Sequence, residues 1–361
     1  MRRITLKYAK PGMFLGFPVY DIYGKLLYTH NTQLNRFNLE MMKSLGIGEV
    51  LIQDRRVDDV AVTPMFSPEV EGLIMESFRK LILDNLGKEQ IAGNDILALN
   101  VNVNKAVQSL TFQALGGINV SGGILPDDYI FYQAVKTATI ALVMGHKLKY
   151  SKSDLVHLAM AAILKDVACI IDPNMVAMET DSTPDTERRL IRGHPQIGHD
   201  LLNQDYFTKG DIATAVLQHH EYWDGSGYPQ GLKGTAISQL AQIIGIVDSF
   251  TAMLYYPTPG KKKTMAHEVI EYVMAYVGDH FNAELVDLFV KEMPCYPSGM
   301  TVLMNSGERA IVIDPNLGVV GRPVVRIYTD RDGKPIAKPF DVNLAKSSEQ
   351  ERLISTLLEY D

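Results

Sequence analysis

The clearest periodicity in the chain lies in its middle, where apolar residues recur at the spacing of an α-helix. Four such segments are separated by short polar links: residues 129–144, 153–164, 186–202 and 211–220. Residues three or four apart share one face of a helix, so each segment predicts a helix with a buried side. Ser153 is a suitable N-cap for the second segment. We interpret residues 126–295 as a helical bundle.

The pattern before the bundle is mixed. Residues 1–62 combine short extended runs with turns and one helical segment, residues 34–45. They predict a small α+β module with a sensory or interaction role. Residues 63–125 read as a helical connector, in which residues 70–86 carry an apolar stripe at helical spacing. Such a stripe is more typical of a core or a dimer seam than of a functional site, which leaves a homodimer open.

After Pro294 the period changes from helix to strand. Apolar runs of strand length occur at residues 301–304, 310–313 and 324–328. Residues 296–361 therefore predict a small β-rich extension that packs against the bundle. The expected fold is mainly α: a helical bundle between a small α+β N-terminal module and this extension.

Composition and charge narrow the class of protein. The 361 residues are 46% hydrophobic and 21% charged, as in ordinary globular domains. No apolar run approaches the roughly 18 residues of a membrane helix. Cys169 and Cys295 are the two cysteines, which is no disulfide framework and fits a reducing cytosol. The net charge of −7 argues against binding of a nucleic-acid polymer. We therefore expect a cytoplasmic protein without a membrane span.

Residues 219–229, which read HHEYWDGSGYP, carry the strongest chemical signal. Imidazole and carboxylate groups suit iron, manganese and zinc. Glycines allow a tight turn, and the proline stiffens its exit. A rigid loop beside metal ligands is what a metal-dependent phosphate site needs. By itself, the run is equally compatible with a helix end that has two surface histidines and a turn.

Every fixed position of this run matches the signature H-H-E-x-x-D-G-x-G-Y-P of the HD-GYP family. Residues 193–198, GHPQIG, are similar to the family segment H-P-x-I-G, and residues 243–250, IIGIVDSF, also fit. The chain thus resembles this family over about residues 126–295, which implies that the predicted bundle is an HD-type helical bundle. The resemblance implies a cytosolic phosphodiesterase that hydrolyses the bacterial messenger cyclic di-GMP with two or three bridged metal ions. It also implies ligand contacts at three loop residues: Gly227, Tyr228 and Pro229.

The resemblance further implies a set of metal ligands. Asp166, His194, His219 and His220 match one complete metal site, in which Asp166 bridges to a neighbouring ion. Asp248 matches a ligand of that neighbouring ion. Three imidazoles and one carboxylate can hold a single iron, zinc or manganese ion.

Several positions depart from the family pattern. The naming segment L-H-D-I-G-K reads LKDVAC here, so Lys165 replaces the histidine and Cys169 replaces the lysine. Gln133 stands where the family has a ligand histidine. Tyr129 stands where some members have a glutamate. Three ligand positions are therefore degenerate: Tyr129, Gln133 and Lys165.

A cationic run replaces the family segment R-P-Y-R, which lies near the substrate. It consists of Lys261, Lys262 and Lys263. These lysines predict either a contact with ligand phosphate or a solvated loop, and the sequence leaves both interpretations open.

Lys165 has two interpretations. An ammonium group has no lone pair and cannot ligate a metal ion. Its charge can instead neutralise Asp166 and Asp248. Lys165 would then be a replacement cation in the catalytic pocket, and one metal position would be redundant. Alternatively, its head extends to solvent and the pocket has drifted.

The loss of one metal site decides the expected function. Bridged metal ions clamp both the attacking and the leaving oxygen of a phosphoryl transfer, so the loss of one weakens catalysis. We expect a degenerate family member that binds cyclic di-GMP, a related cyclic dinucleotide or a signalling partner, with one divalent ion or none. Hydrolysis is expected to be slow or absent. The alternative is an active metal-dependent cyclic di-GMP phosphodiesterase.

Overall fold

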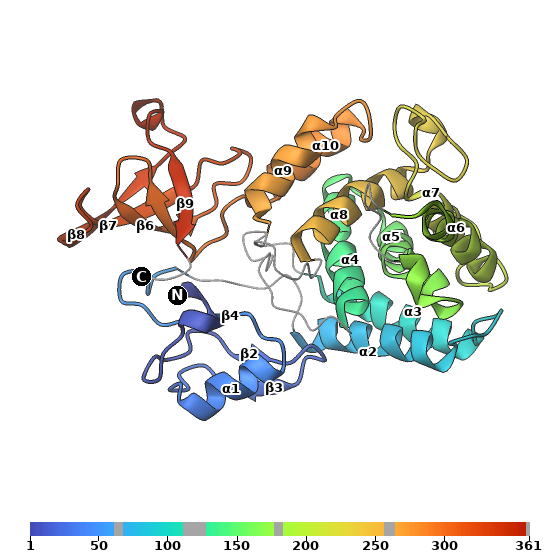
Figure 1. Cartoon of the computed structure of the whole chain (residues 1–361), viewed down its shortest axis with the longest axis horizontal. Helices are drawn as coiled ribbons and strands as arrows, with labels where there is room; N and C mark the ends of the chain where they lie inside the picture. The colour runs from blue at the N-terminus through green and yellow to red at the C-terminus, as the bar shows by residue number, and fades with distance from the viewer. Residues whose placement is uncertain (61–67, 111–127, 177–182, 256–263, 359–361) are drawn as a thin grey trace.

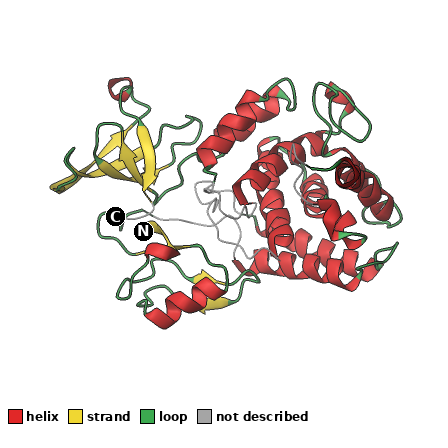
Figure 2. Ribbon diagram, viewed as in Figure 1, coloured by secondary structure: helices red, strands yellow, loops and turns green. Residues whose placement is uncertain are grey.

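The computed structural model in Figure 1 describes residues 1–60, 68–110, 128–176, 183–255 and 264–358. Figure 2 shows a helical body on one side and two strand-containing units, one from each end of the chain, on the other. This architecture confirms the expected fold: mainly α, with a small α+β unit at the N-terminus and a β-rich C-terminal extension.

The helical body is built around one long buried helix. Its helices are α4 (Tyr129–Lys147), α5 (Lys152–Leu164), α6 (Asp185–Leu202), α7 (Asp211–Gln218), α8 (Gln239–Tyr255), α9 (Ala266–Ala275) and α10 (Ala283–Glu292). Most of α4 is buried because its sequence is apolar on nearly all sides, and it packs against α5 and α8. Among the described helices, none is long and apolar enough to cross a membrane.

The start of α5 and the end of α7 differ from the sequence-based prediction in ways that matter for the site. Helix α5 is capped by Ser151, not by Ser153: the Asp154 amide donates to Ser151 Oγ (3.2 Å), and the Ser151 amide donates to Asp154 Oδ2 (3.2 Å). A capping box needs the acidic residue three positions after the cap, and only Ser151 has that spacing. Helix α7 ends at Gln218, so His219 and His220 lie in the turn that follows the helix.

The N-terminal unit has its own small core, which includes the buried side chains of Leu15, Leu34 and Met42. Its elements are β1 (Arg2–Thr5), β2 (Val19–Tyr20), β3 (Leu26–Tyr28), α1 (Arg36–Ser44) and β4 (Glu49–Ile52), and β1 pairs antiparallel with β4 and β2 with β3.

Two connector helices, α2 (Pro68–Asp84) and α3 (Gly93–Ser109), join this unit to the body. The apolar stripe of α2 is largely core, since Ile74 and Phe78 are buried, although Leu73 is half exposed. Lys136 of α4 is also buried, and its ammonium lies 2.7 Å from a Glu71 oxygen of α2. This ion pair fixes the connector on the helix that also carries Gln133.

The C-terminal strands form one antiparallel sheet in the order β8-β7-β6-β5-β9. They are β5 (Thr301–Met304), β6 (Arg309–Asp314), β7 (Val324–Thr329), β8 (Pro335–Asn343) and β9 (Ile354–Leu358). The sequence did not predict β8 and β9. Strand β8 contains Pro335 and Pro339, and it lies at an edge of the sheet, where missing amide donors are tolerated.

Candidate metal centre

Three histidines from two neighbouring helical segments meet within the helical body. His194 lies on α6, and His219 and His220 follow α7. One ring nitrogen of each lies within 4.8 Å of those of the other two. Imidazole nitrogens bind zinc at about 2 Å, so two of them on a common ion lie about 3 to 4 Å apart. The spacing therefore suits a shared metal ion.

The hydrogen bonds of two rings fix their chemical state. His194 Nδ1 lies 2.6 Å from the Ile191 carbonyl oxygen, and His219 Nδ1 lies 2.6 Å from that of Val216. A carbonyl oxygen only accepts, so each Nδ1 carries the hydrogen and each neutral ring has a lone pair on Nε2. The two Nε2 atoms are 3.1 Å apart. Two lone pairs at this distance repel unless a cation or proton lies between them, so the residues present fit a metal ion.

Burial keeps these imidazoles neutral. It lowers the pKa of all three side chains: the pKa of His194 falls, that of His219 falls to about 4, and that of His220 lies well below its usual value. The neighbouring imidazoles lower the pKa values of His219 and His220 further, because a second positive charge would be repelled. At neutral pH the nitrogen lone pairs are therefore available to a metal ion.

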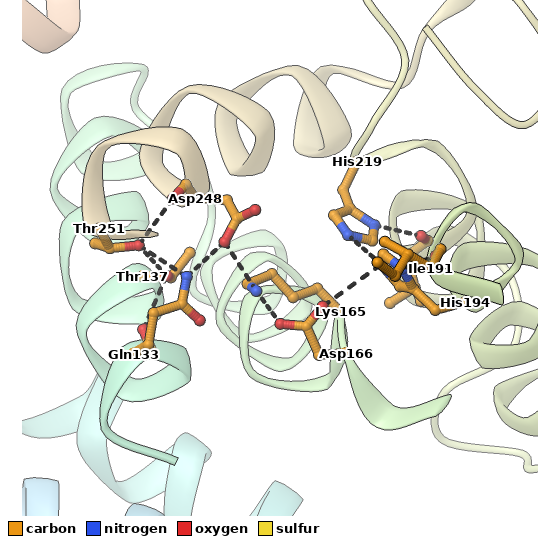
Figure 3. Close-up of polar contacts among 10 residues, drawn as sticks. Gln133, Thr137, Lys165, Asp166, Ile191, His194, His219, Asp248 and Thr251 are labelled. Carbon is orange, nitrogen blue, oxygen red and sulfur yellow. Dashed lines mark hydrogen bonds and ion pairs between the residues drawn. The ribbon is translucent and has the colours of Figure 1, made fainter. Parts of the chain in front are cut away.

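A buried ammonium lies beside this cluster, as Figure 3 shows. Lys165 is 2% exposed and does not extend to solvent. Its Nζ contacts Asp166 Oδ2 and lies 2.8 Å from Asp248 Oδ1. The other oxygen of Asp166 lies 3.5 Å from His194 Nε2. Asp166 thus stands between the ammonium and the histidines.

The charges of this group stabilise one another. Burial alone would lower the pKa of Lys165, but Asp166 and Asp248 outweigh it and raise that pKa. Burial alone would raise the pKa of each carboxyl group, but the ammonium outweighs it and lowers both. Lys165 is therefore charged, and both carboxylates are ionised at neutral pH.

Gln133 holds Asp248 from the other side. Its Nε2 donates to Asp248 Oδ1 (2.5 Å) and to Thr251 Oγ1 (3.0 Å). Tyr129 is the first residue of α4, one helical turn before Gln133. Near Asp166, burial raises the pKa of the Cys169 thiol to about 12, so this side chain is neutral.

The loop after the histidines is held by Glu221, whose role the motif alone did not reveal. Its carboxylate accepts hydrogen bonds from the amides of Gln230 (2.6 Å) and Leu232 (2.9 Å). Tyr228 stacks on His220 with ring centroids 4.8 Å apart, and its peptide bond to Pro229 is cis. Lys261, Lys262 and Lys263 lie outside the described residues.

Gly227 permits the closest backbone approach in this loop. A Cβ atom there would lie 2.3 Å from the Tyr222 nitrogen and 2.5 Å from the His220 carbonyl oxygen. We expect Gly227→Ala to lower the free energy of unfolding by about 2 kcal/mol or more, because backbone must move. Gly193→Ala is the matched control: a Cβ there meets nothing within 4 Å, and alanine favours the helix. Urea unfolding measures both, and equal stabilities would contradict the expectation.

A small pocket lies beside the histidines. Its lining includes His219, His220, Tyr222, Gln242, Ser249 and His280. Tyr222 and His280 are stacked, with centroids 3.8 Å apart and planes 6° apart. The pocket thus offers aromatic and hydrogen-bonding surface next to a cluster that suits a metal ion.

Comparison with known proteins gives consistent matches. The family model of the HD domain matches residues 119–285. A cyclic di-GMP phosphodiesterase of Pseudomonas aeruginosa is 26% identical over 228 residues, which are 63% of this chain and 55% of that protein. The cyclic di-GMP phosphodiesterase response regulator RpfG of Xanthomonas campestris is 32% identical over 154 residues, 42% of this chain and 40% of that protein.

A third relative acts on a different cyclic dinucleotide. A 3'3'-cGAMP-specific phosphodiesterase of Vibrio cholerae is 27% identical over 154 residues, 41% of this chain and 28% of that protein. The similarity thus spans about half or less of these relatives' lengths. A solved HDG"Y"P protein of Bdellovibrio bacteriovorus has a TM-score of 0.53 at 17% identity, over 80% of this chain and 97% of its own. It shares the fold.

Proposed function

We propose, from the premise that this chain belongs to the HD-GYP family of HD domains, that it binds a cyclic dinucleotide at a single-metal centre and hydrolyses it slowly or not at all. The ligand class is cyclic di-GMP or a related cyclic dinucleotide. One observation carries the proposal: the buried Lys165 ammonium contacts both Asp166 and Asp248.

The ammonium argues against a second metal ion. An ion bound by Asp166 and Asp248 would have to lie where Lys165 Nζ lies, or be repelled by it. The second ligand position, Gln133, offers an amide that already donates to Asp248. Without a paired ion, the attacking and leaving oxygens of a phosphodiester lose much of their stabilisation.

The single-metal centre would consist of His194, His219, His220 and Asp166. Iron, manganese and zinc all accept such a set, and a bound ion would supply Lewis-acid attraction for a phosphate oxygen. The chain's own residues keep the imidazoles neutral and aimed: the carbonyl groups of Ile191 and Val216 hold two of the rings.

The two cysteines of the described chain are buried free thiols, which supports a cytoplasmic location. Residues 1–62 would form the sensory or interaction module, residues 63–125 the connector, residues 126–295 the ligand-binding domain and residues 296–361 the extension. Besides the cyclic dinucleotide, a signalling protein is the second class of partner proposed for this chain.

The alternative is an active cyclic dinucleotide phosphodiesterase. It is favoured by the retained histidine triad and by the enzymatic names of the relatives. Metal content and product formation distinguish it from the proposal.

The test uses one purified sample of the full chain. Elemental analysis should find about one iron, manganese or zinc ion per chain, because one ligand set is whole. Calorimetry should detect binding of cyclic di-GMP or cGAMP, and incubation with added manganese or iron should give little linear product. His219→Ala should lose metal and binding. His199→Ala is the control, because His199 lies on α6 outside the triad and pairs with Asp200 (3.0 Å).

Two results would count against the proposal. Two or more tightly bound ions per chain would contradict the single-metal centre. Rapid conversion of cyclic di-GMP to linear dinucleotide or GMP, abolished by His219→Ala, would establish the alternative.

A further inference from the structure

Tyr228 connects helix α6 to the candidate metal centre. Its ring stacks on His220, with planes 23° apart, and the Arg192 guanidinium lies 5.3 Å from the centroid of the same ring. The Tyr228 amide also donates to the His220 carbonyl oxygen (3.1 Å). A guanidinium, a phenol ring and an imidazole thus contact one another in series.

The His220 ring differs from the other two in what orients it. His194 and His219 each donate through Nδ1 to the carbonyl group three residues earlier in the chain. Within the described residues the His220 ring makes no hydrogen bond, and its ring contacts are with His194, His219 and Tyr228. Arg192 is the exposed member at the far end of this series.

A guanidinium on an aromatic ring suits phosphate recognition. The cation–π contact uses the flat face of the group. Its N–H groups lie in the plane and can donate to two phosphate oxygens at once. Tyr228 would therefore hold Arg192 in a fixed position on the loop that follows His220.

The charge of the molecule favours a cationic side chain at a site for anionic ligands. The chain carries a net charge of −7, and an anionic ligand is repelled unless positive charge lies at its site. Arg192 of α6 contacts the loop of the candidate site through the Tyr228 ring.

We propose that Arg192 binds a phosphate group of the ligand and determines the affinity of the site for anionic ligands. This inference rests on the proposed cyclic dinucleotide site, and it assigns a ligand contact to a residue outside the sequence motifs. Tyr228 is then a positioning residue that acts through both Arg192 and His220.

The test compares two matched substitutions on α6. Arg192→Gln removes the charge and keeps most of the stem. Arg189→Gln removes the same charge from an exposed arginine of the same helix that has no contact with Tyr228 among the described residues. Calorimetry gives the Kd for cyclic di-GMP and cGAMP at low and high salt, and elemental analysis gives the metal content.

We expect Arg192→Gln to raise the Kd by about tenfold or more at low salt, as for loss of a hydrogen bond to a charged group. The loss should shrink at high salt, because screening already weakens the charge interaction in the wild type. Arg189→Gln should bind like the wild type, and both variants should keep their metal. Arg192→Lys, which retains charge without the planar fork, should recover part of the affinity.

The outcomes separate this inference from the proposed function. If the wild type and Arg192→Gln bind equally tightly, the phosphate contact is refuted and the dinucleotide site stands. A loss of affinity that is independent of salt and accompanied by metal loss would reduce Arg192 to a support for Tyr228 and His220, which also refutes the phosphate contact. If the wild-type chain binds neither dinucleotide, the proposed function and this inference fall together.

Discussion

Lys165→Met is expected to lose much of its stability at neutral pH without metal and to regain stability when manganese or zinc is added. The substitution leaves Asp166 and Asp248 buried without the ammonium that contacts both. Removal of one partner from a buried ion pair costs about 3 to 5 kcal/mol. This is a large share of the roughly 5 to 15 kcal/mol that stabilises a typical domain.

Metal should restore stability because it replaces the missing charge. A divalent ion bound by the two carboxylates binds only the folded chain, and a ligand at about 100 times its Kd adds about 2.7 kcal/mol. Thermal unfolding of Lys165→Met, with chelator and with added manganese or zinc, measures the effect. The same additions should change the wild type less, since its ammonium remains in place.

Lys136→Met is the matched control. Lys136 is also a buried lysine, but it pairs with the single carboxylate of Glu71 (2.7 Å). Its loss should be similarly destabilising, and metal should not correct it, because within the described residues Glu71 is the one carboxylate that pairs with Lys136. Equal rescue of both variants, or full stability of metal-free Lys165→Met, would contradict the role of Lys165 as a replacement cation.

The contribution of Asp166 and Asp248 to folding stability should depend on pH with opposite signs in the wild type and in Lys165→Met. In the wild type Lys165 lowers the pKa of both carboxyl groups, so their contribution to stability is present above the unfolded pKa of about 3.9 and is lost as pH falls. In metal-free Lys165→Met, burial and mutual repulsion raise at least one carboxyl pKa. That contribution is present at low pH and is lost as pH rises through the raised pKa. The stability difference between variant and wild type should therefore be larger at pH 8 than at pH 5.

Local periodicity predicts most of the helices and fewer of the strands. Helix α6 was predicted to within one residue at its start, because its apolar residues recur at helical spacing within the segment itself. Strand β1 was not, because Arg2 and Arg3 give no strand signal and their burial depends on distant groups. Arg2 lies 2.9 Å from an Asp54 oxygen, and Arg3 donates to the Ser298 carbonyl oxygen (3.0 Å).

The residue types of the candidate site are visible in the sequence, but their arrangement is not. The sequence left open whether Lys165 points to solvent or to the carboxylates, because the answer depends on where α8 places Asp248. The tautomers of His194 and His219 follow from carbonyl groups three residues earlier, which only a helical backbone aims at Nδ1. Arg192 lies outside the family motifs and becomes conspicuous only when Tyr228 folds onto His220.

The double variant Lys165→His with Gln133→His is expected to bind one additional metal ion per chain, so that its content rises from about one to about two. The two changes place imidazoles beside Asp166 and Asp248. Gln133 is 2% exposed, and its Nε2 already lies 2.5 Å from Asp248 Oδ1. A histidine at position 133 would therefore face the same carboxylate. Elemental analysis after removal of loosely bound metal measures the gain.

The two single variants are the controls for the double variant. Gln133→His alone keeps the Lys165 ammonium, which repels an incoming ion, so its metal content should stay at about one. Lys165→His alone supplies one nitrogen donor and leaves the Gln133 amide, which donates to Asp248 and has no nitrogen lone pair for a metal. A second ion should therefore be held only loosely, as in Lys165→Met with added metal, and should be lost when loosely bound metal is removed. Hydrolysis of cyclic di-GMP is a secondary readout, because Cys169 still lacks the positive charge of the family's lysine. If the double variant folds normally and binds no more metal than the wild type, Gln133 is not the lost ligand position, and α4 supplies no ligand to this centre.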